Sequence, residues 1–87
     1  MRILIADRNQ LVNRLVQMKL EKWGHKVDVA LTGTDAREAL KLNSYRMVIM
    51  DWGLEGTDAP DLCRYVRSLD KVSYTYVMFF SDRTGHD

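Results

Sequence analysis

The sequence predicts an α/β domain built around a mainly parallel sheet. Two observations predict it: short continuous apolar runs, typical of strands buried on both faces, and, between them, longer segments whose apolar residues recur at helical spacing. The inferred order is strand, helix, strand, helix, strand, helix, strand. Right-handed crossovers between parallel strands then place helices on both faces of one open sheet. The chain has 87 residues and no internal repeat, which indicates a single domain.

The N-terminal third predicts a strand, a helix and a second strand. Residues 3–6 form a continuous apolar run, and a helix is expected over residues 9–23, because Gly24 supplies a stop. Two apolar sets recur at helical spacing in that helix: Leu11, Leu15 and Met18, and Val12, Val16, Leu20 and Trp23. Trp23 is expected to be a packing residue. Val27 and Val29 alternate with polar residues, the pattern of a half-exposed edge strand.

The middle of the chain continues the alternation. Thr34 or Asp35 can cap a short helix that ends before the turn-favouring residues Asn43 and Ser44. A second continuous apolar run follows over residues 47–50. This run is expected to form a third buried strand.

The third predicted strand stops at Asp51, and a loop rich in glycine and aspartate leads to the next helix. Pro60 suits the first turn of that helix, whose apolar residues are spaced to face the core: Leu62, Val66 and Leu69. Residues 74–80 are expected to form the fourth strand, which ends at Ser81. Four methionines are expected to fill the core: Met18, Met47, Met50 and Met78.

Polar residues stand directly after three of the four predicted strands. They are Asp7 and Arg8, then Asp51 to Gly53, then Ser81 and Asp82. In open parallel sheets, ligands bind outside the carboxyl ends of the strands, so these groups are expected to meet at one edge. Carboxylate oxygens suit a hard cation such as Mg²⁺, and a carboxylate can act as a nucleophile toward phosphorus. Any one aspartate is more often a turn residue, but three strand ends together favour a site.

Composition excludes several other kinds of function. Thirteen Lys and Arg against twelve Asp and Glu leave a formal charge of +1 without a basic cluster, so nucleic acid is not expected as a direct partner. The longest apolar run is too short for a membrane span, and no signal segment follows Met1, which makes the cytoplasm the default location. Cys63 has no partner for an internal disulfide, and a zinc site is not expected.

Four segments of the sequence resemble the receiver domain of two-component response regulators. They are ILIAD at residues 3–7, MVIMDW at 47–52, the stretch 54–67, and VMFFSD at 77–82. A narrower resemblance, to receivers that precede diguanylate cyclase output domains, is carried by residues 21–25, 50–52 and 74–80. The resemblance implies a flavodoxin-like, three-layer open sheet with strand order 2-1-3-4. It also implies a signalling domain rather than an enzyme, since any cyclase activity would belong to an output domain.

The resemblance further implies a site and its chemistry. A partner histidine kinase would phosphorylate Asp51, and Ser81 would be the switch hydroxyl that turns toward the phosphoryl group. Mg²⁺ would be held by Asp7, Asp51 and the backbone carbonyl of Gly53. A different class, a small flavin- or nucleotide-binding protein, is disfavoured because no glycine-rich loop follows the first strand.

Two residues depart from the family pattern at this site. Arg8 stands where a second acidic residue is usual, and Asp82 stands where a small residue is usual. Arg8 places a permanent cation near Asp51 and is expected to weaken divalent-ion binding, while Asp82 is expected to repel an incoming phosphoryl group. These departures keep an alternative open: a pseudo-receiver, an interaction or dimerisation module that works without phosphate.

The family's fifth strand and last helix find no counterpart in the 87 residues. Residues 1–87 are therefore expected to form a single, C-terminally incomplete receiver domain, without the lysine that pairs with the phosphoryl group in the family. The fourth strand would then present an unpaired edge, and such an edge invites pairing with another chain. A homodimer or a strand-exchanged assembly is expected.

Overall fold

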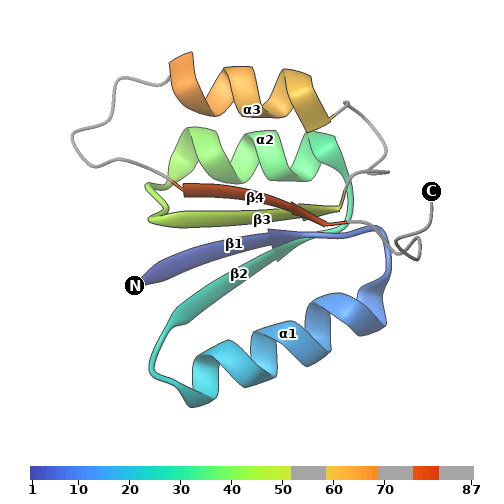
Figure 1. Ribbon diagram of the computed structural model, residues 1–87, viewed down its shortest axis with the longest axis vertical. Helices are drawn as coiled ribbons and strands as arrows, with labels where there is room; N and C mark the ends of the chain where they lie inside the picture. Colours follow the sequence, from blue (N-terminus) through green and yellow to red (C-terminus); the bar gives the residue numbers. More distant parts are fainter. Residues whose placement is uncertain (52–58, 69–75, 81–87) are drawn as a thin grey trace.

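The chain folds as a four-stranded parallel sheet between two layers of helices (Figure 1). The computed structural model describes residues 1–51, 59–68 and 76–80. The elements, in chain order, are β1 (Arg2–Ala6), α1 (Gln10–Lys22), β2 (Lys26–Ala30), α2 (Gly33–Leu42), β3 (Met47–Asp51), α3 (Ala59–Ser68) and β4 (Tyr76–Phe80). Helix α1 covers one face of the sheet, and α2 and α3 lie side by side on the other (Figure 1). The predicted class and order of elements are confirmed.

The strands lie in the order β2-β1-β3-β4, and all three pairings are parallel. This is the order that the resemblance implied. The first strand of the chain is thus central, and β2 and β4 are the two edges of the sheet that the described residues form. The predicted edge position of β2 is confirmed. The predicted alternation holds only in part, because Val27 is buried but Val29, two residues on, is 39% exposed.

Two hydrophobic clusters fill the two sides of the sheet, because successive strand residues point to opposite faces. On the side of α2 and α3 lie Leu4, Ala6, Ala30, Ala36, Leu40, Tyr45, Val48, Met50 and Val66. On the side of α1 lie Ile3, Ile5 and Val27, with Val16, Leu20, Met47 and Ile49 packed against them. Strand β1 contributes to both clusters, which explains why its sequence is a continuous apolar run.

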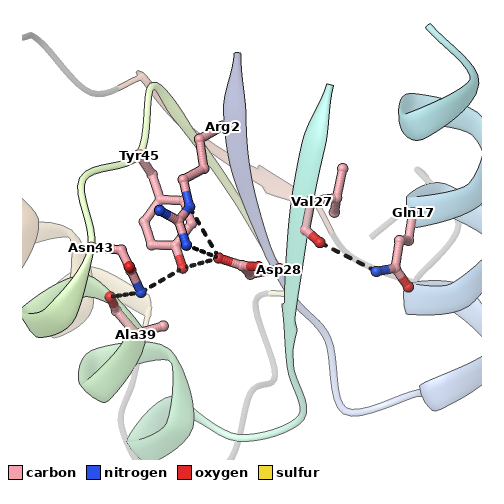
Figure 2. A network of polar contacts seen from close by, with 7 residues as sticks. All are labelled: Arg2, Gln17, Val27, Asp28, Ala39, Asn43 and Tyr45. Carbon is pink, nitrogen blue, oxygen red and sulfur yellow. Dashed lines mark hydrogen bonds and ion pairs between the residues drawn. The ribbon is translucent and has the colours of Figure 1, made fainter. Parts of the chain in front are cut away.

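The buried face of α1 differs from the sequence expectation. Four large apolar residues of this segment are between 57% and 66% exposed: Leu11, Leu15, Met18 and Trp23. The expectation that Met18 and Trp23 pack in the core is therefore wrong. Val16 and Leu20 pack against the sheet. On the same side of the helix, the amides of Asn13 and Gln17 donate to backbone carbonyls of β2, both at 3.2 Å (Figure 2 shows Gln17). The side of α1 that faces the sheet therefore carries hydrogen-bonded amides as well as apolar residues, so apolar spacing alone does not identify it.

Local signals set the helix ends. Gly24 has a φ of +90°, a conformation that favours glycine, and confirms the predicted stop after α1. Helix α2 ends at its C-cap Asn43, also as predicted. Its start was placed too late: the N-cap is Thr32, whose Oγ1 accepts from the backbone N–H of Asp35 at 3.1 Å, rather than Thr34 or Asp35 itself. Thr32, Thr34 and Asp35 are all residue types that cap helices, and the first of them, Thr32, is the N-cap.

A polar network ties β1 and β2 to the connection between α2 and β3 (Figure 2). Asp28 Oδ2 accepts from Tyr45 Oη at 2.6 Å and from Arg2 Nη2 at 3.0 Å. The hydrogen bond from Tyr45, with help from the Arg2 guanidinium, holds the pKa of Asp28 below its ordinary value, against the opposing effect of burial. Burial, and then the Asp28 carboxylate, raises the pKa of Tyr45 to about 12.

Helix α3 and strand β4 complete the described fold. Val66 is 5% exposed and packs in the core as predicted, whereas the predictions for Leu62 and Leu69 lie outside the described side chains. Met78 is 53% exposed and Tyr76 is 57% exposed. The expectation that Met78 fills the core is therefore wrong, because the face of β4 that carries these two residues is open to solvent in the part of the chain that the structure describes.

Candidate functional site

The carboxyl edge of the sheet brings two of the predicted site residues next to each other. Ala6 of β1 pairs with Met50 of β3, and Asp7 and Asp51 each follow by one residue. Both aspartates are 4% exposed. Two buried carboxylates therefore lie on adjacent strands at the edge where parallel sheets bind ligands.

Asp7 is held by hydrogen bonds on both of its sides. Its backbone N–H donates to Ala30 O at 3.1 Å, and its Oδ1 accepts from the backbone N–H of Asn9 at 2.8 Å. The second bond is the turn role that any single aspartate tends to have. An ionised carboxylate offers about four lone-pair sites on its two oxygens, so it can accept more than one hydrogen bond or cation.

Asn13 is a site-supporting residue that the sequence reasoning missed. Its Nδ2 donates to Asp7 O at 2.8 Å and to Ala30 O at 3.2 Å, and the residue is 1% exposed. Its Oδ1 is buried without a hydrogen-bond partner among the described residues. Asn13 thus joins the ends of β1 and β2 beneath Asp7. A polar residue four positions after the helix cap Asn9 was the available signal, because it stands where an apolar residue would be expected.

Arg8 reaches the second carboxylate. Its Nε lies 3.5 Å from Asp51 Oδ2, and the arginine side chain is 51% exposed while that of Asp51 is 5% exposed. The expectation that Arg8 places a cation near Asp51 is confirmed by this ion pair. An ion pair half open to water is screened, so its attraction is worth about 1 kcal/mol or less.

The donor set suits a hard cation better than a soft one. Mg²⁺ binds through one or two carboxylates and keeps several waters, which fits Asp7 and Asp51 as neighbours. Within residues 1–51, 59–68 and 76–80, no three His, Cys, Asp or Glu side chains group as a metal cage. The remaining expected site residues, Gly53, Ser81 and Asp82, lie outside the described residues. In the sequence, Ser81 follows Phe80, the residue that pairs with Asp51.

No helix in the described part of the chain combines the length and apolar character needed to cross a membrane.

Comparison with known proteins identifies the family to which the chain belongs. Residues 3–87 match the family described as the response regulator receiver domain. The chain is 33% identical over 67 residues to the transcriptional regulatory protein ResD of Bacillus subtilis, an overlap of 76% of this chain and 28% of ResD. The chain therefore spans less than a third of that relative's length.

Two solved structures show the same fold. The N-terminal domain of a response regulator/sensory box/GGDEF protein from Carboxydothermus hydrogenoformans superposes with a TM-score of 0.83 at 28% identity, over 98% of this chain and 67% of that one. The response regulator TrrA of Thermotoga maritima, in complex with Mg²⁺ and BeF, superposes with a TM-score of 0.77 at 23% identity, over 90% of this chain and 68% of that one. From its matched residues and its fold, the chain belongs to the response regulator receiver domain family, a family of signalling domains.

Proposed function

We propose that this chain is a phosphoacceptor receiver in which Asp51 accepts a phosphoryl group from a sensor histidine kinase with the help of Mg²⁺. The observation that carries the proposal is the pair of buried carboxylates, Asp7 and Asp51, on adjacent strand ends. Two carboxylates at that depth need cations or donors to remain ionised. A metal ion would bind to both carboxylates, and a phosphoryl group would be accepted by Asp51 beside that ion.

The chemistry assigned to Asp51 is nucleophilic. One carboxylate oxygen attacks phosphorus, an O–P bond forms, and the bond from phosphorus to the donor breaks, which leaves an acyl phosphate on Asp51. Asp7 and the backbone carbonyl of Gly53 would complete the ligands of Mg²⁺, which would neutralise charge on the transferred oxygens. Ser81 would turn its hydroxyl toward the phosphoryl group as the switch, and Asp82 would oppose the approach of that group through its charge.

The experiment is phosphorylation of the 87-residue chain with acetyl phosphate and Mg²⁺, read by intact mass. We expect one adduct of about 80 Da, the mass of a phosphoryl group. Asp51→Asn should abolish the adduct, whereas Asp35→Asn, which changes an exposed aspartate on α2, should retain it. An adduct that persists in Asp51→Asn would assign the acceptor elsewhere.

A second candidate function is favoured by one contact. The ion pair between Arg8 and Asp51 gives the acceptor carboxylate a cation without any metal. A pseudo-receiver, working as an interaction or dimerisation module without phosphate, would use the fold in this state. The same mass measurement on a full-length version separates the two: no adduct there supports the pseudo-receiver.

The domain and its assembly are part of the same proposal. Residues 1–87 would belong to one receiver domain, and a diguanylate cyclase is the kind of output domain that it would serve. Strand β4 lies at an edge of the described sheet, and its residues Tyr76 and Met78 are more than half exposed. An exposed apolar edge strand is a template for pairing, so the chain is proposed to form a homodimer or a strand-exchanged assembly.

A further inference from the structure

Arg8 is the cation that the structure pairs with the candidate acceptor. Its Nε lies 3.5 Å from Asp51 Oδ2, and its side chain is 51% exposed against 5% for Asp51. A buried carboxylate therefore meets a guanidinium that solvent can reach.

The backbone that carries Arg8 is fixed on both sides. Asp7 N–H donates to Ala30 O at 3.1 Å before it, and Asn9 N–H donates to Asp7 Oδ1 at 2.8 Å after it. Asn9 also caps α1 by accepting from the first helical N–H groups. The starting point of the Arg8 side chain is thus held in place, while the side chain itself is half exposed to solvent.

We propose that Arg8 is a built-in counter-ion that competes with a divalent cation for Asp51 and so lowers the metal affinity of the site. This inference rests on the proposed function for the role of Asp51. It concerns metal binding itself, which is measured without any phosphotransfer.

Charge and space both support the competition. Counting only these three described residues, the carboxylates of Asp7 and Asp51 give a formal charge of −2, and Arg8 reduces it to −1. Mg²⁺ demands near-octahedral geometry and keeps several waters, so a guanidinium against Asp51 Oδ2 occupies room that the hydrated ion needs. The metal must either displace Arg8 or bind beside a like charge. Because an ion pair half open to solvent is weak, the competition reduces metal affinity without abolishing it.

The test is calorimetric titration of the 87-residue chain with MgCl₂. Arg8→Ala and Arg8→Gln both remove the charge, and each should bind Mg²⁺ about tenfold more tightly than the unchanged chain, given partly screened Coulomb repulsion. Arg8→Lys keeps the charge and should stay close to the unchanged chain. The matched control is Arg14→Ala, which removes an exposed arginine from α1 and should leave the affinity unchanged. Circular dichroism checks that each variant is folded, and Asp51→Asn locates the binding at this site.

The outcomes separate this inference from the proposed function. Equal or weaker Mg²⁺ binding in both neutral variants, or binding too weak to measure in every variant, overturns the role of Arg8. If Arg8→Ala binds Mg²⁺ more tightly but acetyl phosphate labels no variant, the counter-ion role stands and the phosphoacceptor role fails. If the unchanged chain is labelled on Asp51 while its Mg²⁺ affinity equals that of Arg8→Ala, the phosphoacceptor role stands and the counter-ion role fails.

Discussion

Single residues far from the site also carry structural roles, and Tyr45 is the clearest. It is 4% exposed, and its hydroxyl donates to Asp28 at 2.6 Å while Arg2 donates to the same carboxylate oxygen. Asn43 Nδ2 lies 3.4 Å from the Tyr45 hydroxyl (Figure 2). One phenol thereby links β2 to the connection that leads into β3. The sequence around residue 45 gave no hint of this network, because its partners are far apart along the chain.

The pH dependence of this link is predictable. Tyr45→Phe should lower the free energy of unfolding at pH 7 by about 1–2 kcal/mol, because Asp28 loses a hydrogen bond to its ionised form. The pKa of Asp28 is lowered by folding, so the stability it contributes is present above its ordinary pKa of 3.8 and is lost as the pH falls through the lower, folded value. Urea unfolding at pH 7 and at strongly acidic pH should show the variant converging on the unchanged chain in acid.

At alkaline pH, the stability that the Tyr45 hydroxyl contributes changes with pH in the opposite direction. Folding raises the pKa of Tyr45 from 10.0 to about 12, so this contribution is present below pH 10 and is lost as the pH rises through the folded value. Tyr65→Phe, which removes a hydroxyl from a half-buried tyrosine on α3, is the matched control. An equal pH dependence in Tyr45→Phe and the unchanged chain would contradict the assigned role.

Helix α1 shows how an element can place polar groups against a sheet. Asn13 and Gln17 donate to backbone carbonyls at and near the carboxyl end of β1 and along β2, and Val16 and Leu20 supply the apolar contacts. The helix thereby fixes both the sheet edge and the strand end that carries Asp7. The same face of α1 therefore provides the apolar packing of Val16 and Leu20 and the hydrogen bond of Asn13 that holds the backbone of Asp7.

Asn13→Ala tests that role. We expect a loss of about 2 kcal/mol in unfolding free energy, because Asp7 O loses the hydrogen bond from Asn13 and Ala30 O keeps only the one from the Asp7 N–H. Leu15→Ala, on the exposed face of the same helix, should change stability by only about 0.5 kcal/mol or less. Thermal or urea unfolding measures both. A smaller effect for Asn13→Ala than for Leu15→Ala would show that the contacts of α1 have been assigned to the wrong face.

The same helix shows what the sequence could and could not predict. The strands were recognisable because β1 and β3 are buried on both faces and read as unbroken apolar runs. Asp7 and Asp51 were predictable from their place at strand ends. The orientation of α1 was not, because Leu11, Leu15 and Met18 are spaced as well as the set that is buried. Hydrogen bonds from Asn13 and Gln17 decide between the two faces, and they depend on where β2 lies.

At the scale of the whole molecule, the two edges of the described sheet differ. Strand β2 carries Lys26 and Asp28, charged residues of the kind that discourages edge pairing. Strand β4 reads YVMFF and exposes two of its residues on one face. Of the two edges of the described sheet, β4 is therefore the one that the proposed pairing of two copies would use.

Association through β4 is tested by sedimentation at increasing, high micromolar concentration. We expect the unchanged chain to associate and Met78→Lys to remain monomeric at the same concentrations, because the lysine replaces exposed apolar surface with charge. Leu42→Lys, at a residue 76% exposed on α2, should associate like the unchanged chain. Monomers at every concentration of the unchanged chain would contradict the proposed assembly.

The central position of β1 has a consequence for how the protein is made. Ile3 pairs with Val27 on one side and Met47 on the other, and both partners are synthesised after it. Because the chain is synthesised from its N-terminus, β1 can pair first with β2 and only later with β3. Contacts between distant parts of a chain form slowly. Both edges of β1 are therefore paired only after β3, which ends at Asp51, has been synthesised.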